Sequence, residues 1–507
     1  MNSLYSISLD QILTDWWNNI GLSVRKAFFF VAGINLLAFG FEMTNLTLHH
    51  DDLYQIFIQD DILGHYVGRF GVGKLHYYGM NGYFMPFFQM FAGIVLMSLY
   101  GIIIAHLWGA RKTMDMALIA SIICVFPYMA QVYQYNTSMA TYSMAHLLVA
   151  IAVFLSTRAT LVHVATASIL YVFAFSIYQS VIANAATIFV FYALACLLFS
   201  EEGHSPAWKA MARSTLAALL AVFIGGLIYL AIVSVIGINI DSVHASEKAF
   251  TLSDGINLSY AATEIAQGTR SFFFWPENYF PDYLKKLQLL LLAGAGIVCL
   301  WLPRSPGGKF GAVAMLVVAS LCPRLLQLLH SEGVYHNLTL TAYGVVIAGA
   351  VMIINRAAHT AIRNLSIVLS FFLIAGYIMQ CNWISTVNYL NTQAHYSTLT
   401  QVLARIRSLP GDDWNGKNIV VVGKYKMSSN YPFKSATGVA VSFMDAFHMQ
   451  HLANLMRDDV AFTGADDTTP EALEYAATHP SWPHPASVGV INGTGVVVLS
   501  ELEEAEN

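Results

Sequence analysis

Long apolar runs separated by short polar connections constrain the fold of this chain more than any other feature. A helix needs about 20 mostly apolar residues to cross a bilayer, and about eleven runs of roughly that length occur here. Their approximate bounds are 27–46, 84–107, 113–130, 138–156, 160–179, 181–199, 212–236, 284–302, 309–329, 337–354 and 362–384. Charged residues make up only 11% of the chain, against about 25% in soluble domains. The sequence therefore predicts a polytopic α-helical membrane protein and excludes a soluble enzyme.

Lysine and arginine residues mark one side of these predicted spans. The connections that carry them alternate along the chain, and their basic residues are Arg25 and Lys26, Arg111 and Lys112, Arg158, Lys209 and Arg213, Arg304 and Lys309, and Arg356 and Arg363. The short connections around 131–137, 178–181 and 330–336 contain neither lysine nor arginine. Because cytoplasmic loops carry the excess of basic residues, we predict a cytoplasmic N-terminus and an external C-terminus.

Polar residues gather in three segments on the predicted outer side. After a cytoplasmic N-terminus at 1–26, we expect a transmembrane domain over 27–384 and an external domain over 385–507. The transmembrane domain has two long outer loops, at about 47–83 and 237–283. No removable signal peptide is expected before the first span. Chemistry should be sought in the outer loops and the external domain, where polar side chains are plentiful.

The external domain alternates strand and helix patterns. Asn418–Lys424 is an apolar run typical of a buried strand, and Gly438–Arg457 has the spacing of an amphipathic helix. Ser487–Leu499 predicts two short strands around an Asn492-Gly493 turn. We therefore expect a small C-terminal α/β domain.

Charge and motif content exclude several classes of function. Net charge is −5 and no basic run stands clear of an apolar segment, so nucleic acid is not an expected partner. The 5 cysteines lie in apolar stretches without CxxC spacing, which indicates neither disulfides nor a cysteine metal site. No GxSxG, Walker A or strand-linked GxGxxG motif occurs, so hydrolase, ATPase and dinucleotide-binding interpretations lack support.

Two acidic pairs in the first outer loop are the sharpest chemical signal. Asp51 and Asp52 follow the first span by a few residues, and Asp60 and Asp61 follow them. A carboxylate at the membrane surface can act as a general base on a sugar hydroxyl, and an adjacent carboxylate can raise its pKa. The alternative is an acidic turn that caps a helix over Leu53–Leu63. Both interpretations remain open.

Two arginines on the outer side have the chemistry of phosphate ligands. Arg69 lies in the segment Gly68-Arg69-Phe70, and its planar guanidinium suits phosphate oxygens; the alternative is an interfacial anchor. Arg324 lies toward the outer end of the ninth span, where a charge is costly and usually functional. It either binds a phosphate oxygen or pairs with Glu332 or an acid of the first loop.

Histidines and aromatic residues supply weaker signals. His49 and His50 offer metal ligands beside the first acidic pair, but neighbouring residues seldom converge and no HExxH pattern occurs. We predict no metal site from these residues, and a divalent cation held by the carboxylates stays an open alternative. His330 belongs to a short polar loop near Arg324. The aromatic segment 270–279 is either a re-entrant stretch that shapes a lipid or sugar site or an interfacial belt.

The acidic pair after the first span, the Gly68-Arg69-Phe70 segment and the Pro-Arg step in a late span together resemble the glucosyl transferases of O-antigen modification, the Gtr type II group. The resemblance covers about 25–385. It departs from the group at Phe70, where tryptophan is expected, and in the tail, which is variable in such proteins.

The resemblance implies a GT-C enzyme of the bacterial inner membrane that uses an undecaprenyl-phosphate-linked sugar. The sugar, expected to be glucose, moves to O-antigen or another cell-surface glycan on the periplasmic face. Asp51 or Asp52 would be the general base for an inverting displacement, and Arg69 and Arg324 would stabilise the phosphate leaving group. Further contacts to donor or acceptor are expected from five polar residues, namely His50, Asp60, Asp61, His330 and Glu332. Membrane lipid, the lipid-linked donor and the glycan acceptor are the expected partners.

Two other classes of function stay open. A flippase or carrier for lipid-linked saccharides would use Arg324 and the acids to line a path, although carriers commonly show internal repeats that this chain lacks. A ligase or acyltransferase would place a histidine base near His49-His50 or His330.

Overall fold

The computed structural model describes residues 18–56, 68–199, 207–237, 258–275, 277, 279–303, 305–328, 336–357, 359–409, 414, 416–426, 443–464 and 470–500. These residues form two compact units. The helical unit takes its described residues from Met1–Met43, Asp60–Tyr133 and Ser138–Asn382, and the sheet unit from Thr44–Gln59, Gln134–Thr137 and Trp383–Asn507. Part of the predicted site lies outside the described residues, namely Asp60, Asp61, His330, Glu332 and the side chain of His50.

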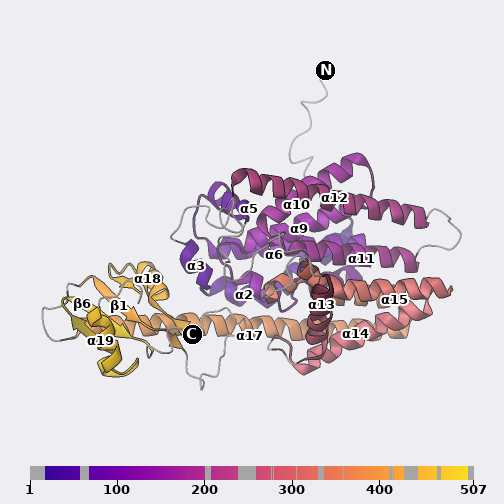
Figure 1. Cartoon of the computed structure of the whole chain (residues 1–507). Helices are drawn as coiled ribbons and strands as arrows, with labels where there is room; N and C mark the ends of the chain where they lie inside the picture. The colour runs from indigo at the N-terminus through magenta and orange to yellow at the C-terminus, as the bar shows by residue number, and fades with distance from the viewer. Residues whose placement is uncertain are drawn as a thin grey trace. The chain divides into compact units, whose positions relative to one another are not determined.

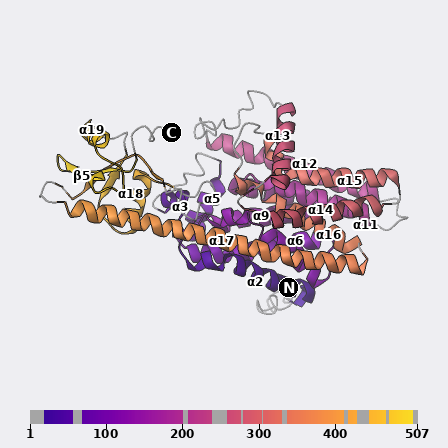
Figure 2. The ribbon, with the colours of Figure 1, turned by 90° about the horizontal axis from the view of Figure 1, so that it is seen from below.

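Helices make up nearly all of the described helical unit (Figure 1). Their bounds are α2 Leu22–Thr44, α5 Phe70–Lys74, α6 Pro86–Leu107, α7 Thr113–Cys124, α8 Met129–Tyr133, α9 Met139–Ser156, α10 Leu161–Ile177, α11 Val181–Phe199, α12 Ala207–Ile236, α13 Leu258–Phe274, α14 Asp282–Trp301, α15 Pro306–Leu321, α16 Ala342–Ala357 and α17 Thr360–Arg407. Shorter turns are the π-helix Leu75–Gly79 and the 3₁₀ segments Cys322–Leu328 and Asn337–Leu340. The long helix α17, orange in Figure 2, supplies Trp383–Arg407 to the sheet unit.

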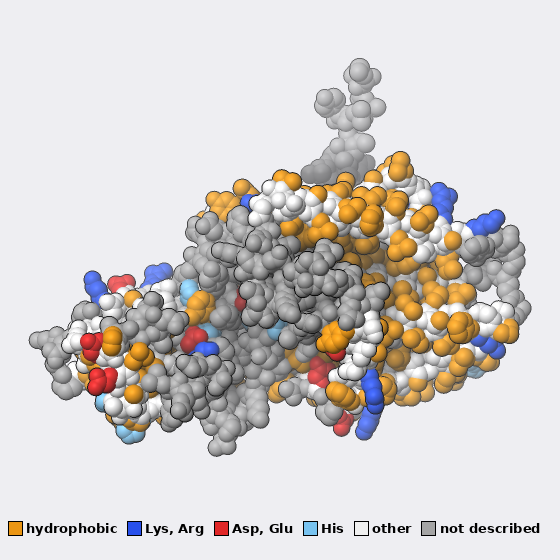
Figure 3. Space-filling view, in the orientation of Figure 1, with side chains coloured by type: hydrophobic (Ala, Val, Ile, Leu, Met, Phe, Trp, Pro, Cys, Tyr) orange, Lys and Arg blue, Asp and Glu red, His pale blue; other side chains and the backbone are white. Residues whose placement is uncertain are grey.

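Among the described residues, 9 helices are long and apolar enough to cross a membrane. Two shorter apolar helices, Thr113–Cys124 and Leu161–Ile177, occupy the remaining predicted runs. Hydrophobic side chains cover much of the visible face of the helical unit over α12 and α15 (Figure 3), and Leu216, Phe223 and Phe310 are among those exposed. Apolar surface of this extent is typical of contact with lipid rather than water. The chain is therefore a polytopic membrane protein, as predicted.

Three contacts join connections that are distant in sequence. Arg356 Nη1 donates to the backbone oxygen of Trp108 at 2.6 Å, and Arg363 pairs with Asp115 at 3.0 Å. Ser214 Oγ donates to the backbone oxygen of Thr157 at 3.0 Å. Connections that the sequence places on the basic side thus meet one another in the folded chain.

Prolines interrupt two of the predicted runs. The run at 113–130 divides into α7 and α8, and Pro127, which has no N–H to donate, lies between them. The run at 309–329 changes from α15 to a 3₁₀ segment at Cys322, and Arg324 within that segment has a non-helical backbone (φ −104°, ψ 17°). The proline at 323 thus explains why the late arginine lies in a break rather than in a regular helix.

The sheet unit contains a mixed four-stranded sheet in the order β4-β1-β6-β5. The strands are β1 Asn418–Val422, β4 Ala461–Thr463, β5 Val488–Ile491 and β6 Thr494–Val498, and the helices α18 Ala446–Leu455 and α19 Pro470–Thr478 accompany them. A separate pair joins β2 Tyr425–Lys426 to β3 Phe443–Met444. β1 is parallel to β4 and β6, and β5 is antiparallel to β6.

The turn between β5 and β6 lies where the sequence predicts it. Asn492 and Gly493 both have positive φ, 49° and 80°, as a two-residue hairpin with a type I′ turn requires. The predicted strand at Asn418–Lys424 and the α/β character of the domain are likewise confirmed.

The core of the sheet unit also includes a piece of the first outer loop. Leu53 in the short helix α3 (His50–Gln55) is 2% exposed, and it belongs to the same buried cluster as Leu399 and Val402 of α17 and Ile419 of β1. Burial of these apolar groups holds α3 against the C-terminal part of the chain. The acidic pair within α3 is therefore carried by the sheet unit.

Candidate functional site

The first turn of α3 places Asp51 and Asp52 on one rigid element. His49 precedes the helix, and its Nδ1 atom accepts from the backbone N–H of Asp51 at 3.2 Å. The Oδ2 atom of Asp52 accepts from the backbone N–H of His49 at 3.1 Å, which completes a capping box. Asp52 thus helps to cap the start of a helix, but this helix begins at His50 rather than at Leu53, and the acid lies within its first turn.

Asp52 also ties α3 to the connection before α9. Its Oδ2 atom accepts from Asn136 Nδ2 at 3.0 Å. Its Oδ1 atom accepts from the backbone N–H of Thr137 at 3.1 Å and from Thr137 Oγ1 at 3.2 Å. The side chain has 0% exposure. Both carboxylate oxygens are therefore engaged inside the sheet unit.

Burial sets the acidity of this carboxyl group. It raises the pKa of Asp52 to about 6, although the hydrogen bonds from Asn136, His49 and Thr137 act in the opposite direction. A carboxyl group in this range is a stronger base than an ordinary aspartate and stays largely ionised at neutral pH.

Asp51 differs from Asp52 in its access to other molecules. It is only partly buried, whereas its neighbour is fully enclosed. A general base must reach within about 2.6–3.2 Å of the proton that it removes. Of the two acids, Asp51 has the better geometry for contact with a substrate, and Asp52 has the geometry of an anchor.

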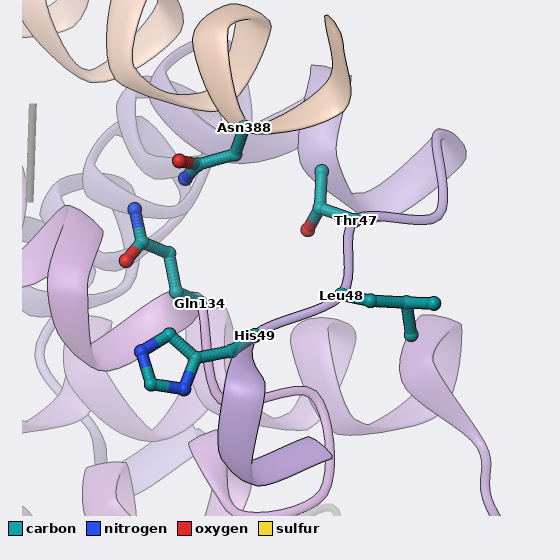
Figure 4. A pocket seen from close by; sticks show the side chains of 5 residues that line it. All are labelled: Thr47, Leu48, His49, Gln134 and Asn388. Atoms are coloured by element: carbon teal, nitrogen blue, oxygen red, sulfur yellow. The ribbon is translucent and has the colours of Figure 1, made fainter. Parts of the chain in front are cut away.

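A small pocket lies beside the acidic pair within the sheet unit (Figure 4). Its enclosed volume is about 10 Å³, the size of one water molecule or hydroxyl group, and it is partly open. It is lined by Thr47, Leu48, His49, Gln134 and Asn388. His49 lines the pocket and also caps the helix that bears the acids. One lining residue of the pocket therefore also caps the helix that carries the candidate base.

Arg69 is held inside the helical unit by aromatic and amide side chains. Its Nη1 atom donates to Tyr142 Oη at 3.2 Å and its Nε atom to Gln179 Oε1 at 3.4 Å. The guanidinium also lies 5.3 Å from the centre of the Tyr178 ring. These contacts orient the guanidinium towards buried helices.

The glycine before Arg69 is required by the backbone. Gly68 has φ +69°, and a Cβ atom there would lie 2.6 Å from Tyr229 Oη. Tyr229 Oη donates to the backbone oxygen of Gly68 at 3.2 Å and accepts from Gln179 Nε2 at 2.8 Å. The Gly68-Arg69-Phe70 segment therefore fits one specific place between α10 and α12.

Arg324 occupies a different place in the helical unit. Its Nε atom donates to Tyr343 Oη at 3.2 Å. The guanidinium lies directly against the backbone of α13 at Gly268, where a Cβ atom would overlap it. The predicted pairing of Arg324 with Glu332 falls outside the described residues.

Sequence reasoning did not select Glu277, whose carboxyl group feels the positive charge of this arginine. Glu277 accepts a hydrogen bond from Tyr128 and lies 3.8 Å from Lys285 Nζ. Burial raises its pKa, against the opposing effects of Tyr128, Lys285 and Arg324. The signal was present in the sequence as an acid at the end of the 270–279 aromatic segment, followed by a lysine at the start of the next span.

The aromatic segment itself divides between interior and surface. Phe272 and Phe273 are buried, and the Phe272 ring stacks on Tyr343 with centroids 3.8 Å apart. Phe274 and Trp275 are exposed. Phe272 and Phe273 therefore help to hold Tyr343, which accepts a hydrogen bond from Arg324.

The structure brings Asp51 and Asp52 together with His49, Asn136 and Thr137 in the sheet unit. Arg69 and Arg324 lie in the helical unit with separate sets of partners. Across the described ranges, no group of three or more His, Cys, Asp or Glu side chains is arranged to hold a metal ion.

Most of the chain matches the model of a known protein family. The family model described as "Glucosyl transferase GtrII" matches residues 40–403, which is more than half of the chain. The matched region contains the acidic pair, both arginines and Glu277. A search of the curated proteins found no match.

Proposed function

Since this chain belongs to the glucosyl transferase GtrII family, we propose that it moves glucose from undecaprenyl-phosphate glucose onto O-antigen or another cell-surface glycan. The enzyme would have GT-C architecture and would lie in the bacterial inner membrane, with its N-terminus in the cytoplasm and its C-terminus in the periplasm. The observation that carries the proposal is the acidic pair on α3, in which one carboxyl is anchored and its neighbour is accessible.

In the proposed reaction Asp51 acts as the general base. It takes the proton of an acceptor hydroxyl while the hydroxyl oxygen attacks the anomeric carbon of the donor. The bond between that carbon and the phosphate oxygen breaks, and undecaprenyl phosphate leaves with the electron pair. A single displacement of this kind inverts the anomeric centre.

Asp52 is proposed as the positioning residue for this base. Four hydrogen bonds from three residues fix its carboxylate and, with it, the first turn of α3. Asp51 shares that turn and has its backbone N–H bound by His49. A base held in this way loses little freedom when the substrate binds.

Arg69 and Arg324 are proposed to bind the donor phosphate and stabilise the negative charge that grows on it. Their guanidinium groups are held by tyrosine hydroxyls at 3.2 Å. A guanidinium presents several N–H donors in one plane, which suits it to bind two phosphate oxygens at once.

The test is transfer of radiolabelled glucose from synthetic undecaprenyl-phosphate glucose to cell-envelope glycan in matched membranes. We expect transfer by the wild type and none by Asp51→Asn. Asp459→Asn, which changes an exposed aspartate elsewhere in the sheet unit, is the control and should keep full transfer. Full transfer by Asp51→Asn would remove the base from this mechanism.

One observation favours a carrier of lipid-linked saccharides instead. Glu277 and Lys285 form a largely buried ion pair at the start of α14, and charges inside a helical bundle often mark a transport path. Absence of transfer by the wild type, together with movement of the lipid-linked sugar between leaflets of a vesicle, would favour that function.

A further inference from the structure

Two buried amides face each other across the pocket beside the acidic pair. Gln134 is 3% exposed and Asn388 is 6% exposed. Their amide ends point towards one another in Figure 4. Neither the nitrogen nor the oxygen of either amide has a hydrogen-bond partner among the described residues. Burial of an amide without a partner is unfavourable, so such groups are usually satisfied by an ordered water or by a group of a bound ligand.

The unpartnered polar groups continue along one face of α17. Polar residues repeat every three or four positions in this part of α17, which places them on the same side of the helix. They are Asn388, Asn391, Thr392 and His395. All are buried. Both side-chain atoms of Asn391 and the Nε2 atom of His395 also have no partner within the described part of the chain. Thr392 Oγ1 accepts from the backbone N–H of Leu48 at 3.2 Å, which fixes this face against the wall of the pocket.

The chemistry of the lining identifies the kind of ligand. The amides of Gln134 and Asn388 each offer donors and an acceptor, and Thr47 and His49 add further polar groups. The lining contains no lysine or arginine, which phosphate recognition would require. A neutral ligand whose hydroxyl groups both donate and accept fits these walls. The enclosed space is about 10 Å³ and the pocket is partly open, so it has room for a single hydroxyl group at the edge of a sugar ring whose remainder lies outside.

The pocket is connected to the acidic pair by two short links. His49 lines it and is hydrogen-bonded through its backbone and ring to Asp52 and Asp51. Gln134 lies two residues before Asn136, the side chain that donates to Asp52. A sugar edge held between the amides would therefore bring neighbouring hydroxyl groups towards α3.

We propose that Gln134 and Asn388, with Thr47, form a saccharide-binding subsite beside Asp51. The assignment as a subsite for transfer rests on the proposed function, because the bound sugar belongs either to the acceptor glycan or to the lipid-linked donor. The shared chemistry is a set of sugar hydroxyl groups, and the two sources are separated by the test.

The test measures binding to the full chain in lipid nanodiscs with two probes. One probe is radiolabelled O-polysaccharide freed of lipid, and the other is undecaprenyl-phosphate glucose. Asn388→Leu and Gln134→Leu replace each amide with an apolar group of similar size. We expect each to weaken binding of one probe at least tenfold and to leave the other within twofold, which identifies the source of the sugar.

Stability separates this proposal from a purely structural role. Because the amides have no partners among the described residues, the leucine variants should melt at or above the temperature of the wild type. Gln401→Leu, at an exposed position of the same helix, is the control and should leave binding of both probes unchanged. Unchanged binding of both probes by both pocket variants would overturn the proposal.

If a leucine variant fails to fold, Asn388→Asp and Gln134→Glu decide the question, because they keep the shape and replace a donor with a charge. Loss of saccharide binding by these variants supports the subsite, and retention of binding overturns it.

The subsite and the proposed transferase activity can fail independently. If binding depends on the amides but the wild type transfers no glucose, the transferase activity alone is rejected. Transfer by the wild type, with binding and KM values untouched by the variants, would reject the subsite alone.

Discussion

Asn136 Nδ2 donates to Asp52 Oδ2 at 3.0 Å, across a separation of 84 residues in sequence. The same amide nitrogen donates to the backbone oxygen of Thr47 at 2.7 Å. One side chain from the connection before α9 thus holds both the start of the first outer loop and the acidic residue in it. The position of the candidate base depends on this long-range contact as much as on its own helix.

Replacement of Asp52 by asparagine should destabilise the sheet unit. The carboxylate accepts from Asn136, His49 and Thr137, and an amide nitrogen in its place would face at least one of these donors. An unsatisfied buried donor costs about 1–3 kcal/mol. The thermal midpoint of purified Asp52→Asn should therefore fall below that of the wild type, as measured by tryptophan fluorescence.

Asp51→Asn provides the comparison, because the side chain of Asp51 is only partly buried. Its midpoint should stay close to that of the wild type. Equal midpoints for wild type and Asp52→Asn would show that the hydrogen bonds of Asp52 contribute little to stability.

The stability of the sheet unit should depend on pH through Asp52. Burial raises the pKa of this carboxyl to about 6, so the folded state binds its proton more strongly than the unfolded chain does. Between roughly pH 4 and pH 6 the folded state holds the extra proton, and the free energy of unfolding falls as the pH rises. The contribution is at most about 3 kcal/mol, lost on passing from acid to neutral pH.

The measurement is the thermal midpoint of wild type and Asp52→Asn across that range. Other carboxylates add their own pH dependence, so only the difference between the two proteins reports on Asp52. The midpoint of the wild type should drop more steeply with rising pH than that of the variant. Parallel curves would contradict a raised pKa at this residue.

Asp51→Asn should remove catalysis and keep the fold. Loss of a general base typically lowers the rate by about 10²–10⁴-fold, and asparagine keeps the size of the side chain. The rate of glucose transfer should fall by this factor, with the KM for the donor nearly unchanged. A lower rate accompanied by a lower thermal midpoint would instead indicate a structural role for Asp51.

The polytopic fold could be predicted from sequence because apolar length and basic connections act locally. Each span can be recognised from its own apolar composition. The turn at Asn492 and Gly493 can be recognised because these residue types tolerate the positive φ that the turn requires. The helix ends inside 113–130 and 309–329 are harder to predict from sequence, because a proline ends a helix without ending an apolar run. Arg324 lies inside the candidate span Pro306–Leu328, as the sequence predicts, but in its 3₁₀ segment Cys322–Leu328 rather than in a regular α-helix.

The surroundings of the acids could not be predicted, because they come from distant segments. In the sequence, Asn136 and Thr137 are only part of a connection without lysine or arginine. No local pattern identifies them as hydrogen-bond donors to Asp52. The packing of Leu53 with Leu399 and Val402 likewise depends on tertiary contacts. Asp51 and Asp52 could be selected as candidates, whereas their different exposure required the structure.

The absence of a side chain at Gly268 determines where the Arg324 guanidinium lies. A Cβ atom at Gly268 would overlap the Arg324 guanidinium, which lies against α13 at this point. Alanine normally stabilises a helix relative to glycine by about 1 kcal/mol, so propensity alone would favour Gly268→Ala. The overlap should outweigh this gain and displace the guanidinium from Tyr343, its hydrogen-bond partner at 3.2 Å.

Gly226 in α12 is the matched control, because a Cβ atom there meets nothing within 4 Å. Gly226→Ala should leave glucose transfer unchanged. Gly268→Ala should raise the KM for undecaprenyl-phosphate glucose about tenfold, since a charge-assisted hydrogen bond is worth about 1.5–3 kcal/mol. The KM for the acceptor should not change, because Arg324 is proposed to act on the donor phosphate alone. Equal KM values for the donor in the two alanine variants would show that Arg324 does not bind the donor. Arg69 would then be the remaining phosphate ligand in the proposed mechanism.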